Sequence, residues 1–211
     1  GVAKLRRLDP DADRPLQRFV QRFQGQNFIK EACQKLAWHA LLQNDRPGYR
    51  RYMAQCRTLG SEVVDSDKSA QKEAEEGAVP IPVLLRARLL FDGAYYEKAY
   101  EVLAERTAAQ FEAGRPRLEY YYRKGRLLHG LRKYPQALRF YRLAIDAGAG
   151  ESWYFACNAA LQSALIYEAL DRPKQAITYF HQCLGMRPDE YRTGLHQQAK
   201  SGLARLRGEQ P

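Results

Sequence analysis

The chain has 211 residues, of which 45% are hydrophobic, and a formal net charge of +10. This composition is ordinary for a globular protein, and no apolar run reaches the length of a membrane-spanning helix, so we expect no insertion into a membrane. The chain begins Gly1-Val2 rather than with Met, and we expect that an N-terminal segment is missing from it. The compartment therefore stays open between the cytoplasm and the cell envelope.

The positive charge is unevenly distributed. Residues 1–60 carry 12 basic and 5 acidic side chains and residues 81–150 carry 13 and 7, whereas residues 61–80 carry 2 and 6. The basic segments suit an acidic partner or a nucleic-acid backbone. Because no basic run is longer than three residues and no glycine-rich phosphate loop accompanies one, we favour a solvated arginine-rich surface.

The N-terminal part, residues 1–60, is predicted to form partial and degenerate helix pairs. Residues 11–15 have the composition of a helix start, and apolar residues follow them at three- and four-residue spacing. A second helix is expected from Asn27 to Leu42, and the turn residues 44–48 lead into a returning helix. Residues 61–79 are predicted to be an acidic, solvated helical spacer, because few large apolar residues occur there.

Three further helix pairs are predicted over residues 80–187, separated by loops that contain Gly and Pro. A last amphipathic helix is expected in residues 188–211. Its apolar side would cover the preceding pair and its polar side would face water, which is the role of a capping helix.

One spacing recurs through these pairs: a small residue, an Ala twelve residues later, a bulky apolar residue after four more, and a small residue after three. The clear copies are Gly125, Ala137, Tyr141, Ala144 and Ala164, Ala176, Phe180, Cys183. The degenerate copies are Ala87, Ala99, Leu103, Arg106 and Ala37, Tyr49, Met53, Cys56. Such repetition predicts an array of stacked helix pairs, which usually binds other molecules.

This spacing resembles that of the tetratricopeptide repeat family. The resemblance covers residues 27–207 and implies an all-α fold, an α-α superhelix of about four helix-turn-helix repeats with a C-terminal capping helix. Residues 22–28 and 84–93 are also similar to segments of uncharacterised bacterial tetratricopeptide repeat proteins, a likeness that implies no activity. The departures are Tyr49 in place of Ala and Arg106 in place of a small residue.

In the family, the first helix of each pair lines a concave groove, so the resemblance implies a groove residue set. This set comprises Trp38, Arg88, Phe91, Tyr122, Arg126, His129 and Leu165. Aromatic anchors would hold a peptide, and Arg88 and Arg126 would pair with its carboxylates. Alternatively, Phe91 and Tyr122 pack between helices. Family members that clamp a terminal carboxylate use Lys and Asn at these positions, and because this chain has neither there, we do not expect that clamp.

The sequence offers no constellation for catalysis, a metal or a cofactor. The four histidines are dispersed, and no nucleophile elbow, Walker loop or dinucleotide fingerprint occurs. The four cysteines are Cys33, Cys56, Cys157 and Cys183. Because they form no Cys-x-x-Cys pair and two of them occupy small-residue positions of the spacing, we expect buried thiols.

The leading interpretation is therefore a non-catalytic scaffold that binds a protein or peptide. A first alternative is a basic solenoid that binds single-stranded nucleic acid, for which Tyr120 to Lys124 interleaves aromatic and cationic residues. A second alternative is a structural subunit of a cell-envelope complex. The sequence identifies neither the partner nor the oligomeric state.

Overall fold

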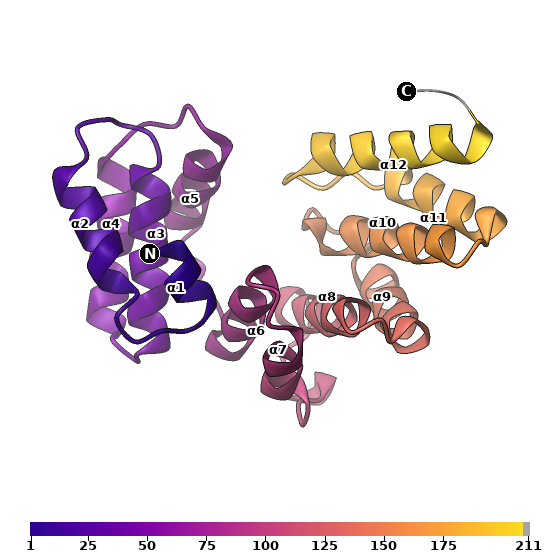
Figure 1. Ribbon diagram of the computed structural model, residues 1–211, viewed down its shortest axis with the longest axis horizontal. Helices are drawn as coiled ribbons and strands as arrows, with labels where there is room; N and C mark the ends of the chain where they lie inside the picture. Colours follow the sequence, from indigo (N-terminus) through magenta and orange to yellow (C-terminus); the bar gives the residue numbers. More distant parts are fainter. Residues whose placement is uncertain (209–211) are drawn as a thin grey trace. The chain divides into compact units, whose positions relative to one another are not determined.

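The structure is a computed structural model that describes residues 1–208 (Figure 1). In this range the chain forms twelve α-helices, one short 3-10 helix and no strand, which confirms the all-α helical-repeat fold. The chain divides into two compact units, Gly1–Val102 and Leu103–Pro211. The predicted boundaries after residues 60 and 79 fall inside the first unit, and the one after 187 falls inside the second. Residues 209–211 of the predicted capping segment lie outside the described residues.

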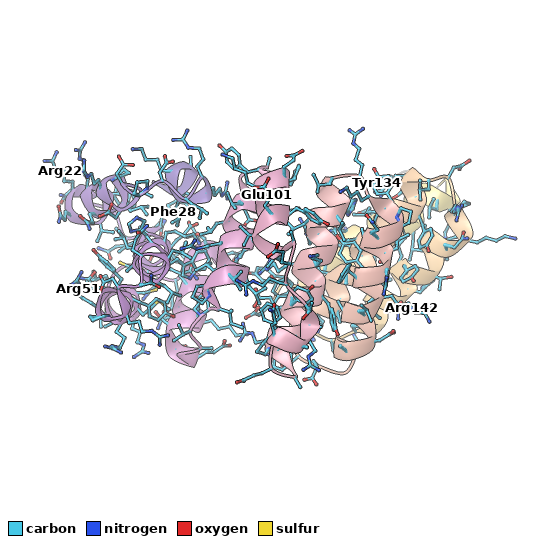
Figure 2. All side chains as sticks on the ribbon, turned by 90° about the horizontal axis from the view of Figure 1, so that it is seen from below. Arg22, Phe28, Arg51, Glu101, Tyr134 and Arg142 are labelled. Carbon is cyan, nitrogen blue, oxygen red and sulfur yellow. The ribbon has the colours of Figure 1, made fainter. Side chains whose placement is uncertain are left out.

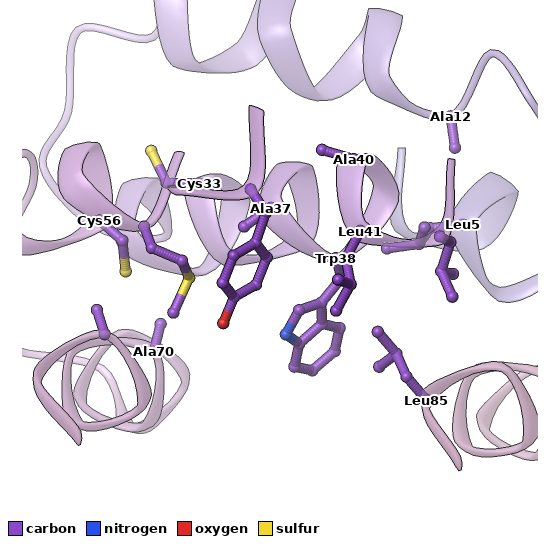
Figure 3. Close-up of a cluster of buried hydrophobic side chains, with 14 of the residues drawn as sticks. Leu5, Ala12, Cys33, Ala37, Trp38, Ala40, Leu41, Cys56, Ala70 and Leu85 are labelled. Atoms are coloured by element: carbon purple, nitrogen blue, oxygen red, sulfur yellow. The ribbon is translucent and has the colours of Figure 1, made fainter. Parts of the chain in front are cut away.

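The first unit is arranged around a central helix. It contains α1 (Val2–Arg6), α2 (Asp13–Arg22), α3 (Ile29–Leu42), α4 (Arg46–Thr58), α5 (Asp65–Glu76), α6 (Pro82–Asp92) and most of α7 (Tyr96–Leu103). Helix α3 contacts α1, α2, α4, α5 and α6. Figure 3 shows Ala70 of α5 and Leu85 of α6 approaching α3 on either side of Trp38. The core is thus built from apolar side chains that converge on α3.

Helix α5 differs from the solvated spacer expected for it, because one of its faces is buried. Ala70, Ala74 and Asp67 are fully buried, and α5 packs against α3 and α4. The Asp67 carboxylate accepts hydrogen bonds from the backbone N–H groups of Phe28 at 2.5 Å and Glu31 at 2.9 Å. These donors belong to the first turn of α3, where N–H groups lack a helical partner and the helix dipole favours a negative charge. Asp67 therefore has a structural role at the start of α3, and α5 is part of the packed core rather than only a solvated helix.

The second unit stacks two helix pairs and a capping helix. It contains the 3-10 helix η1 (Ala108–Gln110), α8 (Arg115–Gly130), α9 (Tyr134–Gly148), α10 (Tyr154–Ala169), α11 (Pro173–Gly185) and α12 (Arg192–Arg207). Helices α8 and α9 pair, as do α10 and α11, and α9 packs on α10. Helix α12 covers α10 and α11 with Leu195, Ala199 and Leu203 buried beneath it. The predicted capping helix is present and packs as expected.

The recurring spacing follows from close contacts between the two helices of a pair. A Cβ atom on Gly125 would lie 2.6 Å from the Tyr141 ring, so only glycine fits opposite this bulky side chain. In the next copy, all four spacing residues, including Phe180, are fully buried. In the degenerate copy that begins at Ala87, Arg106 stands where the other copies have a small residue, and its side chain is exposed. The small and bulky positions are therefore complementary halves of one interface.

All four helix pairs share one turn. Asn44, Ala94, Arg132 and Asp171 each adopt a left-handed backbone, with φ between 53° and 63°. In each turn the N–H of this residue donates to the carbonyl three positions earlier, as Asn44 does to Leu41. The N–H of the next residue donates to the carbonyl five positions before its own, as Asp45 does to Ala40. The two degenerate copies therefore keep the turn of the clear ones, although their spacing residues have diverged.

Candidate protein-binding site

The residues predicted to line a groove lie in both units, so each set is described within its own unit. Trp38, Arg88 and Phe91 belong to the first unit, and Tyr122, Arg126, His129 and Leu165 belong to the second. The rings of Trp38 and Tyr122 are buried, with 2% and 3% of the residue exposed, and the other five residues are partly exposed. Trp38 and Tyr122 are thus core residues, each within its own unit, and only the other five can contact a ligand at the surface.

In the first unit, the Trp38 indole is fixed by hydrogen bonds and flanked by two cations. Its Nε1 donates to Glu73 Oε1 at 2.7 Å, and Gln34 Nε2 donates to the other Glu73 oxygen at 2.7 Å. Lys35 Nζ lies 3.9 Å and Arg88 Cζ lies 4.7 Å from the ring centroid. Cation–π attraction holds both charges at the indole. We call these five residues the Trp38 cluster.

The charges of the Trp38 cluster perturb one another. Burial, together with the positive charge of Arg88, lowers the pKa of Lys35 to about 8. Burial also raises the pKa of Glu73, against the hydrogen bond from Trp38 and the charge of Arg88. Lys35 Nζ lies 3.9 Å from Glu31 Oε1, and Arg88 Nε lies 3.8 Å from Asp92 Oδ2, so both ion pairs are long. Perturbed ionisable groups gathered in this way are typical of binding sites.

The sequence interpretation missed Lys35 and Glu73. Lys35 precedes Trp38 by three residues, a spacing that places both on one face of a helix, and this was the available signal. Glu73 had no such signal, since its helix was expected to be solvated. Phe91 packs against Tyr96, with ring centroids 5.2 Å apart, in agreement with the alternative that it contacts a neighbouring helix.

In the second unit, a hydrogen-bonded network joins the first helices of the two clear repeats. The Tyr122 hydroxyl of α8 accepts hydrogen bonds from Asn158 Nδ2 of α10 at 2.8 Å and from Arg126 Nη1 at 3.2 Å. Gln162 Nε2 in turn donates to Asn158 Oδ1 at 3.2 Å. We call Tyr122, Arg126, Asn158 and Gln162 the Tyr122 network. Only its tyrosine is buried, so the other three side chains are partly open to a ligand.

The electrostatics of this region keep Arg126 charged and His129 neutral. Burial opposes the charge of Arg126, but the neighbouring Tyr122 and Tyr141 raise its pKa above the ordinary value. Burial and the charge of Arg126 lower the pKa of His129 to about 4, and its Nδ1 lies 3.2 Å from the Tyr141 hydroxyl. Leu165 lies on α10 one turn beyond Gln162 and is partly exposed. The surface of α8 and α10 thus combines a cation, two amides and an apolar side chain.

The aromatic and cationic run Tyr120 to Lys124, which motivated the nucleic-acid alternative, is largely internal. The Tyr120 hydroxyl donates to the Arg106 carbonyl at 2.5 Å, and Lys124 Nζ donates to the Leu103 carbonyl. Arg123 is paired with Glu119 at 2.9 Å. Because these groups are buried and engaged, they do not form a platform for stacking bases.

Neither a metal site nor a membrane helix is found in the described part of the chain. Residues 1–208 hold no group of three or more His, Cys, Asp or Glu side chains suited to a metal ion. Over the same range, every helix is too short or too polar to cross a membrane. The four cysteines are buried free thiols, which confirms the expectation from their spacing.

Comparison with known proteins identifies the second unit. Residues 118–147 and 158–190 match the family model of the tetratricopeptide repeat. The first match covers most of α8 and α9, and the second covers most of α10 and α11. No curated protein and no solved structure matches the chain.

Proposed function

Since this chain is a tetratricopeptide repeat protein, we propose that it is a non-catalytic scaffold that binds an acidic segment of a protein partner. Tetratricopeptide repeats generally mediate protein–protein interaction. The observation that carries the proposal is the Tyr122 network, which presents partly exposed hydrogen-bond donors on the first helices of both matched repeats.

The donors of the network suit a peptide. A guanidinium such as that of Arg126 pairs with a carboxylate through two parallel hydrogen bonds. The side-chain amides of Asn158 and Gln162 can donate to, and accept from, the backbone of an extended segment. Leu165 adds an apolar contact beside them. These features favour a partner segment with an acidic residue next to an apolar one.

The Trp38 cluster supports the same function within the first unit. Lys35 and Arg88 are held at one ring, and their own carboxylate partners lie at 3.8 to 3.9 Å. A carboxylate from a partner would form shorter bonds with these cations and reduce their mutual repulsion. We therefore include Arg88 with Arg126 among the residues that receive acidic side chains.

Affinity capture followed by mass spectrometry tests this function. The double variant Arg126→Ala, Asn158→Ala removes donors from the first helices, and Arg139→Ala, Arg142→Ala is its control on the exposed side of α9. We expect partners captured by the native chain and by the control to be lost from the first variant. Circular dichroism would establish that both variants keep their helical content. A partner set that is the same for all three proteins would refute the proposal.

A further inference from the structure

A second charged surface lies in the first unit, away from the residues discussed above. Helix α2 exposes Arg14, Arg18 and Arg22 at four-residue intervals, so the three side chains lie on one face about 6 Å apart along the axis. None of these arginines forms an ion pair with another described residue. The three arginines therefore form a row of exposed positive charges along one side of α2.

Helix α4 extends this surface. Gln17 Nε2 of α2 donates to the Tyr52 hydroxyl of α4 at 2.9 Å, so side chains of the two helices meet at this point. Arg51 Cζ lies 5.0 Å from the centroid of the Tyr52 ring, which places a fourth arginine at the same seam. Figure 2 shows Arg22 on α2 and Arg51 on α4, both within the first unit, Arg22 above and Arg51 below in this view. We call Arg14, Arg18, Arg22 and Arg51 the arginine face.

The acidic residues of α2 and α4 do not neutralise the arginine face. Asp13 accepts a hydrogen bond from Gln17 at 3.2 Å, and Asp45 caps α4 by accepting from the Gly48 N–H at 2.8 Å. Both carboxylates therefore have local structural roles. Asp11 lies close enough to Arg14 for their charges to interact, but its carboxylate is paired with Lys4 at 2.7 Å. Four exposed guanidinium groups of like charge thus leave an excess of positive charge that an external anion would compensate.

We propose that the arginine face docks an acidic helix of a protein partner, whose carboxylates recur at every fourth residue along one side. Such carboxylates are also about 6 Å apart and match the spacing on α2. Arginine rather than lysine suits this role, because its planar fork pairs with carboxylates in a fixed geometry. Phe23, which is 44% exposed and follows Arg22, offers an apolar contact at the end of the face.

A protein partner fits better than a nucleic acid for two reasons. The repeats of this chain belong to a family that mediates protein–protein interaction. In addition, the Tyr52 ring at the centre of the face is covered by Arg51, and its hydroxyl is engaged with Gln17, so it is not open to a base.

The test uses two synthetic helical peptides of the same composition and of about 16 residues, long enough for an isolated helix. In one peptide, glutamates recur at every fourth position, and in the other the same glutamates are spread around the helix. Fluorescence anisotropy measures their binding to the full chain at an ionic strength of about 0.05 M and again at about 0.15 M. A single-stranded and a duplex oligonucleotide are measured in parallel.

We expect the aligned peptide to bind more tightly than the dispersed one. The variant Arg14→Glu, Arg18→Glu, Arg22→Glu should weaken this binding about tenfold or more. The control variant Arg139→Glu, Arg187→Glu, Arg192→Glu changes the net charge equally at exposed sites of the second unit and should leave it unchanged. The neutral variant Arg14→Gln, Arg18→Gln, Arg22→Gln should lie between the native chain and the reversed-charge variant.

Three results would overturn the proposal. The first is equal binding, or none, of the two peptides. The second is an equal loss of binding in the α2 variant and its control, which would indicate unspecific charge attraction. The third is tighter binding of an oligonucleotide that depends on the same arginines, which would assign the arginine face to nucleic acid.

Discussion

The Glu73 carboxylate accepts a hydrogen bond of 2.7 Å from the indole Nε1 of Trp38, and it thereby joins α5 to α3. The second oxygen of Glu73 accepts from Gln34 at the same distance. Both helices belong to the first unit, and the Trp38 cluster that we propose to receive acidic side chains is built on this contact. The stability of that unit and the geometry of its cations are therefore coupled.

We predict that Glu73→Ala destabilises the chain. The substitution leaves the buried Trp38 N–H without its acceptor, which costs about 1–3 kcal/mol. Urea denaturation followed by Trp fluorescence measures the change in the free energy of unfolding. Glu75→Ala, on the exposed side of the same helix, is the control and should change it by less than about 0.5 kcal/mol. Equal values for the two variants would show that the Glu73 hydrogen bonds do not stabilise the fold.

We predict that the contact between α11 and α12 tolerates no added methyl group at Gly202. A Cβ atom there would lie 2.2 Å from Phe180 Cζ, and Phe180 is fully buried. Gly202→Ala should therefore lower the free energy of unfolding by about 1–3 kcal/mol through overpacking. Gly194→Ala, on the same helix with open space around it, should be neutral or stabilising by up to about 1 kcal/mol. A neutral Gly202→Ala would mean that α12 lies further from α11.

We predict a loss of stability as the pH falls from 6.5 toward 4, caused in part by His129. Burial lowers the pKa of this residue from 6.5 to about 4 in the folded state. Between these values the unfolded state binds a proton that the folded state does not, so acidification favours unfolding. Denaturation curves recorded across this range give the free energy of unfolding at each pH. This free energy should depend less on pH for His129→Gln than for the native chain. His181→Gln, at an exposed position of α11, is the control, and an unchanged dependence in His129→Gln would contradict the prediction.

We predict that Lys35 titrates at about pH 8 and that Arg88 contributes to this shift. Burial and the charge of Arg88 together lower its pKa from 10.5 to about 8. Removing the charge with Arg88→Gln should raise the pKa of Lys35, because one of the two causes disappears. Nuclear magnetic resonance of ¹³C-labelled lysine side chains follows this titration directly. Binding of an acidic segment at the Trp38 cluster should also weaken above pH 8, where Lys35 loses its charge.

Much of the fold could be predicted from the sequence because a helix pair is a local structure. The spacing from Gly125 to Ala144 reports contacts between two helices joined by a short turn, and the structure shows those contacts. The amphipathic pattern after residue 190 likewise predicted a helix that covers the preceding pair, as α12 does. In both cases the residues that determine the structure are close together in the chain.

The candidate site was only partly predictable. Arg88, Arg126, His129 and Leu165 are partly exposed, whereas Trp38 and Tyr122 are buried. Helical periodicity places a residue on a face but does not show whether another segment covers that face. The cover over Trp38 is Glu73, which lies 35 residues further along the chain.

The sequence by itself determined the helix pairs and the tetratricopeptide repeat, because periodicity and the spacing of small residues act over a few tens of residues. The left-handed turn that the pairs share was seen only in the structure. Only the tertiary structure decided that α5 packs on α3, that Asp67 and Glu73 bond to α3, and that Gln17 of α2 meets Tyr52 of α4. These contacts join residues 35 to 39 positions apart. Burial and electrostatic environment depend on which segments meet in space, and composition alone does not specify this.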